Sequence, residues 1–206
     1  DDAVTVGSTT AVAALWLSPV IIRFWRDYPD LNIHQITQDR PFHDTREFDF
    51  FIRYGRDGDT TLSHTAIYRD ELVPVATPDL AAKLEGVSLD ELAGQRLIHL
   101  QSASQSWTTW SDWFLELGHR GDVSPGTRVT SYSVALQIAR KGAGLALGWR
   151  RLIQPMIDSG KLSIVGDFKL PAPNEFYLVG LPDEELSENA RRLKSWILND
   201  AKGLSV

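Results

Sequence analysis

A chain of 206 residues with no cysteine cannot rely on disulfides or on thiolate-bound zinc, and it is long enough to bury a core without them. Its net charge of −6 argues against nucleic-acid binding as its main role, because neutralising phosphates requires an excess of Lys and Arg. No apolar run approaches the roughly 18 residues of a membrane span, and residues 1–7 carry no basic or apolar signal region. We therefore expect a cytoplasmic protein or, because a strand begins abruptly at Val4, a piece of a longer one.

The first part of the chain alternates between strand-like and helix-like segments. In chain order we predict a strand at 3–7, a helix at 10–28 that Pro19 should kink or divide, a strand at 31–37, a short helix at 41–47 and a strand at 48–55. Residues 66–78 predict two short strands on either side of the charged Arg69, Asp70 and Glu71.

The second part continues the alternation. Helices are predicted at 79–85, 88–94, 105–118, 132–142, 150–158 and 187–200. Strands are predicted at 96–100, 127–130, 145–149, 162–166 and 175–181. Ser88 with Glu91 predicts a capping box, Gly118 a helix end and Ser187 a helix start. Strands that alternate with helices of this length imply βαβ units and mainly parallel sheets, so the fold class is α/β.

Signals for catalysis and for metal binding are weak. The sequence contains no G-x-S-x-G, G-x-G-x-x-G or P-loop motif, and its five His residues are too widely spaced for a local metal site. Acidic residues gather at 39–49, but we interpret them as flanking a surface helix and pairing with nearby arginines. Trp107, Trp110 and Trp113 recur every three residues, which favours a helix packed on its own lobe over a ligand-binding face. We expect no catalytic residue, cofactor or metal.

Hydroxyl side chains gather at three junctions where a predicted strand leads into a predicted helix. The clusters are Ser8, Thr9 and Thr10; Ser102, Ser104 and Ser106; and Thr130, Ser131 and Ser133. One hydroxyl suffices to cap a helix, and capping alone explains any single cluster. The free N–H groups and the dipole at a helix start also favour a carboxylate, sulfate or phosphate. Because ligands in α/β proteins bind beyond the carboxyl ends of strands, three such junctions indicate a binding site.

Five segments, in order, resemble the effector-binding domain of LysR-type transcriptional regulators, in the subgroup of the glycine-cleavage activator and the β-lactamase regulators. They are "TVGSTTAVAALWLSPVIIRFWRDYPDLNIHQIT", "FDFFIRYG", "DELVPVATPDLAAKL", "KGAGLALGWRRLIQPMIDSGKLSIV" and "FYLVGLP". The resemblance implies two Rossmann-like subdomains joined by two crossover strands, as in type 2 periplasmic binding proteins. Subdomain I would take residues 1–73 and 180–206 and subdomain II residues 74–179. The hinges would lie near Val73–Pro74 and Val179–Gly180.

The resemblance also implies where an effector binds, namely between the two lobes. The expected effector-binding residues are Ser8, Thr9, Thr10, Gln38, Arg40, Tyr54, Ser102, Ser104, Thr130, Ser131, Trp149 and Phe176. Arg40, near the first helix start, favours a negatively charged group on the effector, although it could equally pair with Asp39 or Asp44. The β-lactamase regulators carry a Gly-Thr pair where this chain has Thr10-Ala11, so their cell-wall-fragment ligand is not carried over.

We therefore predict a non-enzymatic sensor domain that binds a small anionic or zwitterionic effector, such as an amino acid or a small organic acid. The family implies self-association as a dimer or tetramer through a two-fold antiparallel pairing, no membrane partner, and DNA binding only through an N-terminal winged helix-turn-helix domain absent from this chain. Two alternatives remain. A periplasmic solute-binding protein of a transporter would share the fold, and an enzyme of the same fold would need an acid/base pair in the cleft.

Overall fold

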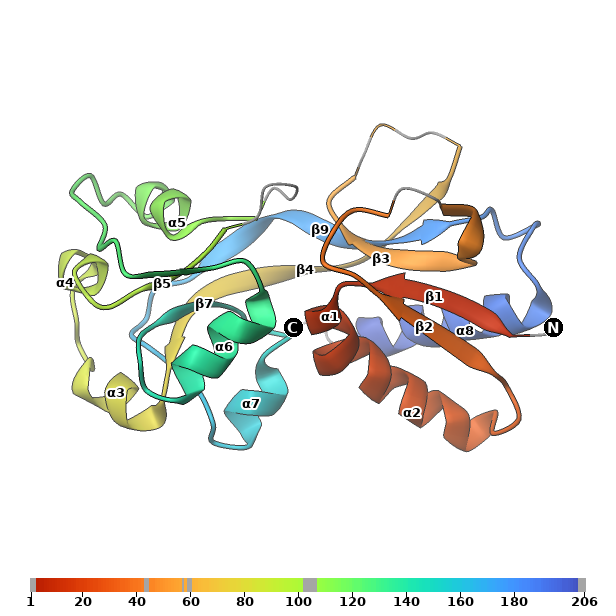
Figure 1. Ribbon diagram of the computed structural model, residues 1–206, viewed down its shortest axis with the longest axis horizontal. Coiled ribbons are helices and arrows are strands. Elements are labelled where there is room, and N and C mark those ends of the chain that lie inside the picture. The colour runs from red at the N-terminus through yellow and green to blue at the C-terminus, as the bar shows by residue number, and fades with distance from the viewer. Residues whose placement is uncertain (1–2, 43–44, 57, 59–60, 102–106, 204–206) are drawn as a thin grey trace. The chain divides into compact units, whose positions relative to one another are not determined.

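The computed structural model describes residues 3–42, 45–56, 58, 61–101 and 107–203 (Figure 1). The chain forms two compact units: unit 1 is Asp1–Arg69 with Asn174–Val206, and unit 2 is Asp70–Pro173. Strands β4 (Ser63–Ala76) and β9 (Leu170–Gly180) each run from one unit into the other. The hinges predicted near Val73–Pro74 and Val179–Gly180 lie within these strands, and their position stays a prediction.

Unit 1 is built on a sheet with the strand order β2-β1-β3-β9. Strand β1 (Val4–Ser8) pairs in parallel with β2 (Ile33–Thr37) and with β3 (Phe50–Tyr54). Strand β3 pairs antiparallel with β9, in a register that sets Phe50 opposite Gly180. Because β1 and β2 are parallel, the chain leaves both at the same edge of the sheet, and this edge carries the first hydroxyl cluster.

The predicted first helix is present but divided into three consecutive segments. They are α1 (Thr10–Val12), the π-helical η1 (Ala13–Leu17) and α2 (Ser18–Asp27). Pro19 explains the division, because it has no N–H to donate and its ring crowds the carbonyl four residues earlier. Helix α2 packs beside the C-terminal helix α8 (Glu188–Lys202), where the rings of Phe24 and Trp196 lie 5.6 Å apart. Ser187 caps α8 as predicted.

Two predictions for this part of the chain need correction. Of the predicted helix at 41–47, the described residues form a single short segment, the 3-10 helix η2 (Thr45–Glu47). The two short strands predicted at 66–78 are one continuous strand, β4, of 14 residues. Asp70 does not interrupt it, because its carboxylate, although the residue is only 1% exposed, accepts the N–H groups of Glu71 at 2.7 Å and Arg151 at 3.1 Å.

Unit 2 contains two sets of paired strands. Strand β4 pairs antiparallel with β7 (Ala146–Trp149) and β8 (Ser163–Ile164), while β5 (Ile98–Leu100) pairs in parallel with β6 (Thr127–Val129). The helices are α3 (Pro78–Lys83), α4 (Leu89–Ala93), α5 (Trp110–Glu116), α6 (Tyr132–Arg140) and α7 (Gln154–Asp158). The prediction of mainly parallel sheets is wrong, because the long strands β4 and β9 enter antiparallel pairs.

The aromatic helix α5 shows how local signals place an element. It begins at a capping box formed by Thr109 and Asp112, later than the predicted start at 105. Trp110 and Trp113 are buried, and their indole N–H groups donate to the carbonyls of Ile98 and Leu72 at 3.0 Å each. The predicted packing of this helix on its own lobe is confirmed. Trp107, by contrast, precedes the helix and is only half-buried.

Candidate functional site

The three side chains of the first hydroxyl cluster, Ser8, Thr9 and Thr10, differ in burial and in hydrogen bonding. Ser8 is buried at the end of β1, and its hydroxyl donates to the carbonyl of Thr9 at 3.0 Å. Thr9 is the N-cap of α1, and its hydroxyl accepts the N–H of Val12 at 3.3 Å. Thr10 is exposed, and its hydroxyl makes no hydrogen bond with the described residues. Of the three predicted binding hydroxyls, Thr10 therefore has the most accessible side chain.

A carboxylate of the protein itself occupies this helix start. The N–H of Thr10 donates to Oδ1 of Asp39 at 3.0 Å. Asp39 is held there by the loop that follows β2, in which the N–H of Gln38 donates to the carbonyl of Ser8 at 3.1 Å. The side-chain amide of Gln38 donates to the carbonyls of Arg40 and Pro41. Gln38 therefore shapes the loop, and Asp39 supplies the negative charge that we had expected from a ligand.

Asp39 was interpreted from sequence as part of an acidic surface segment. The signal that would have located it is its position directly after the strand that pairs with β1. Arg40, the predicted anion-binding residue, is exposed and makes no ion pair within the described part of the chain. The structure shows no contact between Arg40 and the hydroxyl cluster, so its role stays a prediction.

Four aromatic rings of unit 1 form a continuous cluster. Tyr54 and Phe176, both predicted as pocket walls, have ring centroids 5.3 Å apart. Phe176 stacks on Tyr68 at 5.1 Å, and Tyr68 lies 6.0 Å from Trp16. Trp16 is 8% exposed, and its buried indole N–H has no acceptor among the described residues. Sequence spacing missed Tyr68 and Trp16, because both resemble ordinary core residues.

The helix start of α6 in unit 2 differs from that of α1. Ser131 is the N-cap residue with an extended backbone, but its side chain accepts no hydrogen bond from the first turn. The first turn also contains no acidic residue. Thr130 is exposed and Ser131 is half-buried. The positive end of a helix of nine residues is thus flanked by two hydroxyls and left without a side-chain cap.

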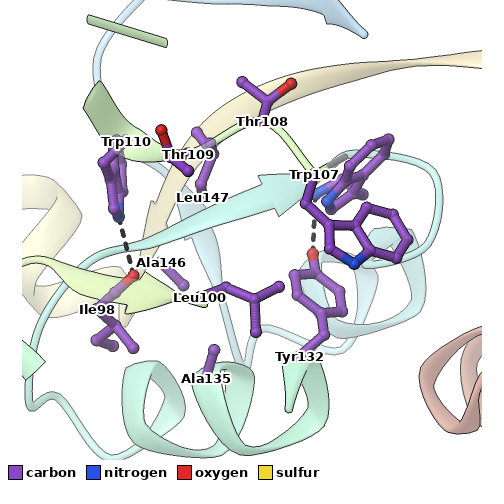
Figure 2. A pocket seen from close by; sticks show the side chains of 11 residues that line it. Ile98, Leu100, Trp107, Thr108, Thr109, Trp110, Tyr132, Ala135, Ala146 and Leu147 are labelled. Carbon is purple, nitrogen blue, oxygen red and sulfur yellow. Dashed lines mark hydrogen bonds between the residues drawn. The ribbon is translucent and has the colours of Figure 1, made fainter. Parts of the chain in front are cut away.

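Behind this helix start lies a small cavity of about 20 Å³, which is room for roughly one water molecule. Figure 2 shows Trp107, Leu100 and Tyr132 around it. The hydroxyl of Tyr132 accepts the N–H of Trp149 at 2.9 Å, and desolvation of that hydroxyl raises the pKa of Tyr132 above its usual value. Trp149, predicted as a pocket wall, is 4% exposed and packs edge-to-face against Trp107 at 5.2 Å. This cavity is too small for an effector.

The remaining predictions concern two serines, metal binding and membrane spans. Ser102 and Ser104 lie outside the described residues. Within the described part of the chain, no group of three His, Cys, Asp or Glu residues could hold a metal ion. None of the helices described is both long enough and apolar enough to cross a membrane.

Residues 1–202 match the model of the LysR substrate binding domain. The chain belongs to the LysR substrate-binding domain family. As such it is an effector-sensing regulatory domain, as predicted.

Curated LysR relatives include the glycine cleavage system transcriptional activator of Escherichia coli K12, 28% identical over 97% of this chain and 65% of the relative. Its Haemophilus influenzae homolog is 27% identical over 91% of this chain and 62% of the relative. The chain thus spans a little under two thirds of the length of these relatives. They are regulators, and neither supports the alternative of a transporter component.

Solved LysR structures share the fold. The effector domain of AmpR from Pseudomonas aeruginosa has a TM-score of 0.81 and 20% identity, covering 98% of this chain and 97% of that one. The regulatory domain of CrgA from Neisseria meningitidis has a TM-score of 0.78 and 20% identity, covering 97% and 98%. These likenesses confirm the predicted fold of the type 2 periplasmic-binding-protein kind.

Proposed function

We propose that this LysR substrate-binding domain senses a small zwitterion, such as an amino acid, and that a DNA-binding segment of the same regulator responds to it. The domain is non-enzymatic and cytoplasmic in this proposal. The observation that carries it is the contrast in charge between the two helix starts. Asp39 accepts the N–H of Thr10 at the α1 start, whereas the first turn of α6 contains no acidic residue and the Ser131 side chain makes no capping hydrogen bond.

The helix start of α6 suits a carboxylate. The dipole and the N–H groups of a helix start favour negative charge, and the first turn of α6 contains no acidic residue and no capping hydrogen bond from Ser131. The hydroxyls of Thr130 and Ser131 lie beside these groups in sequence and can donate to a carboxylate oxygen. We therefore assign the acidic end of the effector to Thr130 and Ser131.

The loop after β2 suits the opposite charge. Among the described residues, the Asp39 carboxylate accepts one hydrogen bond, at Oδ1 from the N–H of Thr10, so it can accept a further one from an ammonium group. A simple organic acid would instead meet repulsion there. This is our reason for favouring a zwitterion over an anion. That one ligand contacts both units is an expectation from the family and is part of the proposal.

The remaining predicted residues take supporting roles in the proposal. Thr10 offers its exposed hydroxyl, while the hydroxyls of Ser8 and Thr9 maintain the helix start. Tyr54 and Phe176 supply apolar surface. Gln38, Arg40, Ser102, Ser104 and Trp149 complete the proposed set.

Self-association is also part of the proposal. On unit 1, Ile22 and Trp25 of α2 are 55% and 37% exposed, and Ile36 of the edge strand β2 is 38% exposed. The hydroxyl of Ser18 and the amide of Gln35 link this helix to this strand at 2.9 Å. Exposed apolar side chains beside an unpaired strand edge are typical of an interface, and two-fold pairing of the domain would cover them.

A thermal-shift screen of amino acids and small organic acids tests the proposal, because a ligand of the folded state raises the melting temperature. The strongest hit is then titrated by calorimetry against Ser131→Ala, which should weaken binding by about tenfold through loss of one hydrogen bond to a charged group. The exposed Ser111→Ala in α5 is the matched control and should leave binding unchanged. Hits confined to neutral compounds, or equal affinity for both variants, would contradict the proposal.

A further inference from the structure

A second hollow lies in unit 2 and is lined by residues of α5, the residues just before it and the first residues of β9. Its volume is about 590 Å³, within the usual range for small-molecule sites. One part of the lining is apolar and is formed by Trp107, Leu115, Pro171 and Pro173. The two charged residues of the lining, Asp112 and Glu116, are both acidic. None of the described residues proposed for effector binding lines this hollow.

The two acidic residues repel each other. Asp112 and Glu116 are four residues apart on α5, so they lie on the same helix face, where like charges destabilise the helix. Asp112 uses Oδ2 to accept the N–H of Thr109. Glu116 is exposed and has no hydrogen bond or ion pair with the described residues. Lys169, close by in sequence, instead pairs with Glu71 at 3.6 Å. Within the described lining, the negative charge is therefore not balanced.

Beside this charge lies apolar surface that is open to solvent. Leu115 is 50% exposed, and Trp107 is half-buried with its ring held edge-to-face against Trp149. Both residues stand next to the acidic pair, and the indole ring is the best π-surface for a cation. A local destabilising pair beside a fixed aromatic ring is the kind of departure from local optimality that is typical of a binding site.

We infer that this hollow binds a small organic cation with an apolar body, such as an arylalkyl ammonium ion. The ammonium group is held by Glu116 and Asp112, and the apolar body packs against Trp107, Leu115 and the two prolines. Charge complementarity selects this occupant over a neutral or an anionic one. The site is independent of the proposed effector residues Thr130 and Ser131.

Calorimetry with 2-phenylethylammonium and its neutral analogue 2-phenylethanol tests the inference. The amine should bind at least about fivefold more tightly than the alcohol. Glu116→Gln and Trp107→Leu should each weaken amine binding by about threefold or more. The exposed Glu85→Gln, which removes the same charge from another surface of unit 2, is the matched control and should have no effect.

The same variants also control for an effect of the substitutions on folding. Glu116→Gln relieves the repulsion with Asp112, so the ligand-free melting temperature should rise or stay unchanged while amine binding falls. Equal affinities for amine and alcohol, or no binding of the amine at millimolar concentration, would overturn the inference. A change of oligomeric state in Leu115→Gln, with amine binding unaltered, would also overturn it by showing that this face contacts another copy of the chain.

One further variant separates this inference from the proposed function. Ser131→Ala should leave amine binding unchanged, because Ser131 does not line the hollow. If Ser131→Ala abolishes amine binding, the amine occupies the effector site, and the second site is refuted while the proposed function is not. If Ser131→Ala has no effect on any hit of the effector screen, the proposed function fails. The second site is then judged only by the titrations with 2-phenylethylammonium.

Discussion

The helix starts of α1 and α6 share a sequence signature and a local topology but differ in charge. In unit 1, β1 leads to Thr9 and Thr10, and the neighbouring parallel strand β2 is followed by Gln38, whose N–H donates to the carbonyl of Ser8. In unit 2, β6 leads to Thr130 and Ser131, and the neighbouring parallel strand β5 is followed by Gln101. The N–H of Gln101 donates to the carbonyl of Val129 at 2.8 Å, in the same relation.

The next residue in each loop makes the difference. After Gln38 the chain carries Asp39, whose carboxylate accepts the N–H of Thr10, and after Gln101 it carries Ser102. The α1 start therefore holds a negative charge of the protein itself, whereas the first turn of α6 contains no acidic residue. In the proposed function, these two helix starts bind groups of opposite charge on the effector. Exchanging charges at the two helix starts tests that interpretation.

The largest effect is expected from Ser131→Asp, which gives the α6 start the negative charge that the α1 start already has. Binding of a carboxylate effector should fall by about 100-fold or more, because like charges meet at the helix start. The domain itself should become slightly more stable, since Asp is a good N-cap residue. Calorimetry and thermal unfolding measure the two effects. Ser187→Asp, which exchanges one cap for another at α8, is the control and should leave binding intact.

A smaller effect is expected from Asp39→Asn, which removes the charge at the α1 start but keeps an oxygen that can accept the N–H of Thr10. Affinity for an amino acid should fall by about fivefold, a modest loss because the site is exposed. Affinity for the same compound without its amino group should stay constant or rise. Titrating both compounds against Asp39→Asn and the exposed control Asp30→Asn decides the point. A parallel loss for both compounds would remove the reason for preferring a zwitterion.

The smallest effect concerns stability alone. Thr9→Ala removes the hydroxyl that caps α1 and should cost about 1 kcal/mol of unfolding free energy. Ser131→Ala removes a hydroxyl that makes no cap and should change this free energy by less than about 0.5 kcal/mol. Urea unfolding of the two variants measures the difference. Equal losses would show that the α6 start is capped in solution, and the contrast between the two units would disappear.

Features that depend on neighbours in sequence could be predicted. The capping box of Ser88 and Glu91 spans three residues, and the structure contains it as expected. Another capping box, at Thr109 and Asp112, is equally local. The prediction followed the run of tryptophans instead and placed the helix start at 105, before the observed start at Trp110. The family pattern predicted the fold, which no single motif in this chain does, and the location of the site that it implies stays a prediction.

Features that depend on contacts between residues far apart in the sequence could not be predicted. The hydrogen bond between Thr10 and Asp39 joins residues 29 apart, and no local pattern distinguishes Asp39 from the acidic residues that follow it. The continuity of β4 depends on the bond from Arg151 to Asp70, across 81 residues. Because this distant bond leaves no trace in the local sequence, the charged residues Arg69, Asp70 and Glu71 were interpreted as a break in the strand. The unpartnered indole N–H of Trp16 likewise has no signature in sequence.

The discontinuity of unit 1 has a consequence for the order in which the protein is made. Unit 2 is one uninterrupted stretch, whereas unit 1 needs β9 and α8 from the far end of the chain. On the ribosome, all of unit 2 therefore emerges while unit 1 still lacks the strand that pairs with β3 and the helix that covers Phe24. Residues 3–69, although synthesised before unit 2, complete their folding only after β9 and α8 have emerged, and until then β3 presents an open strand edge.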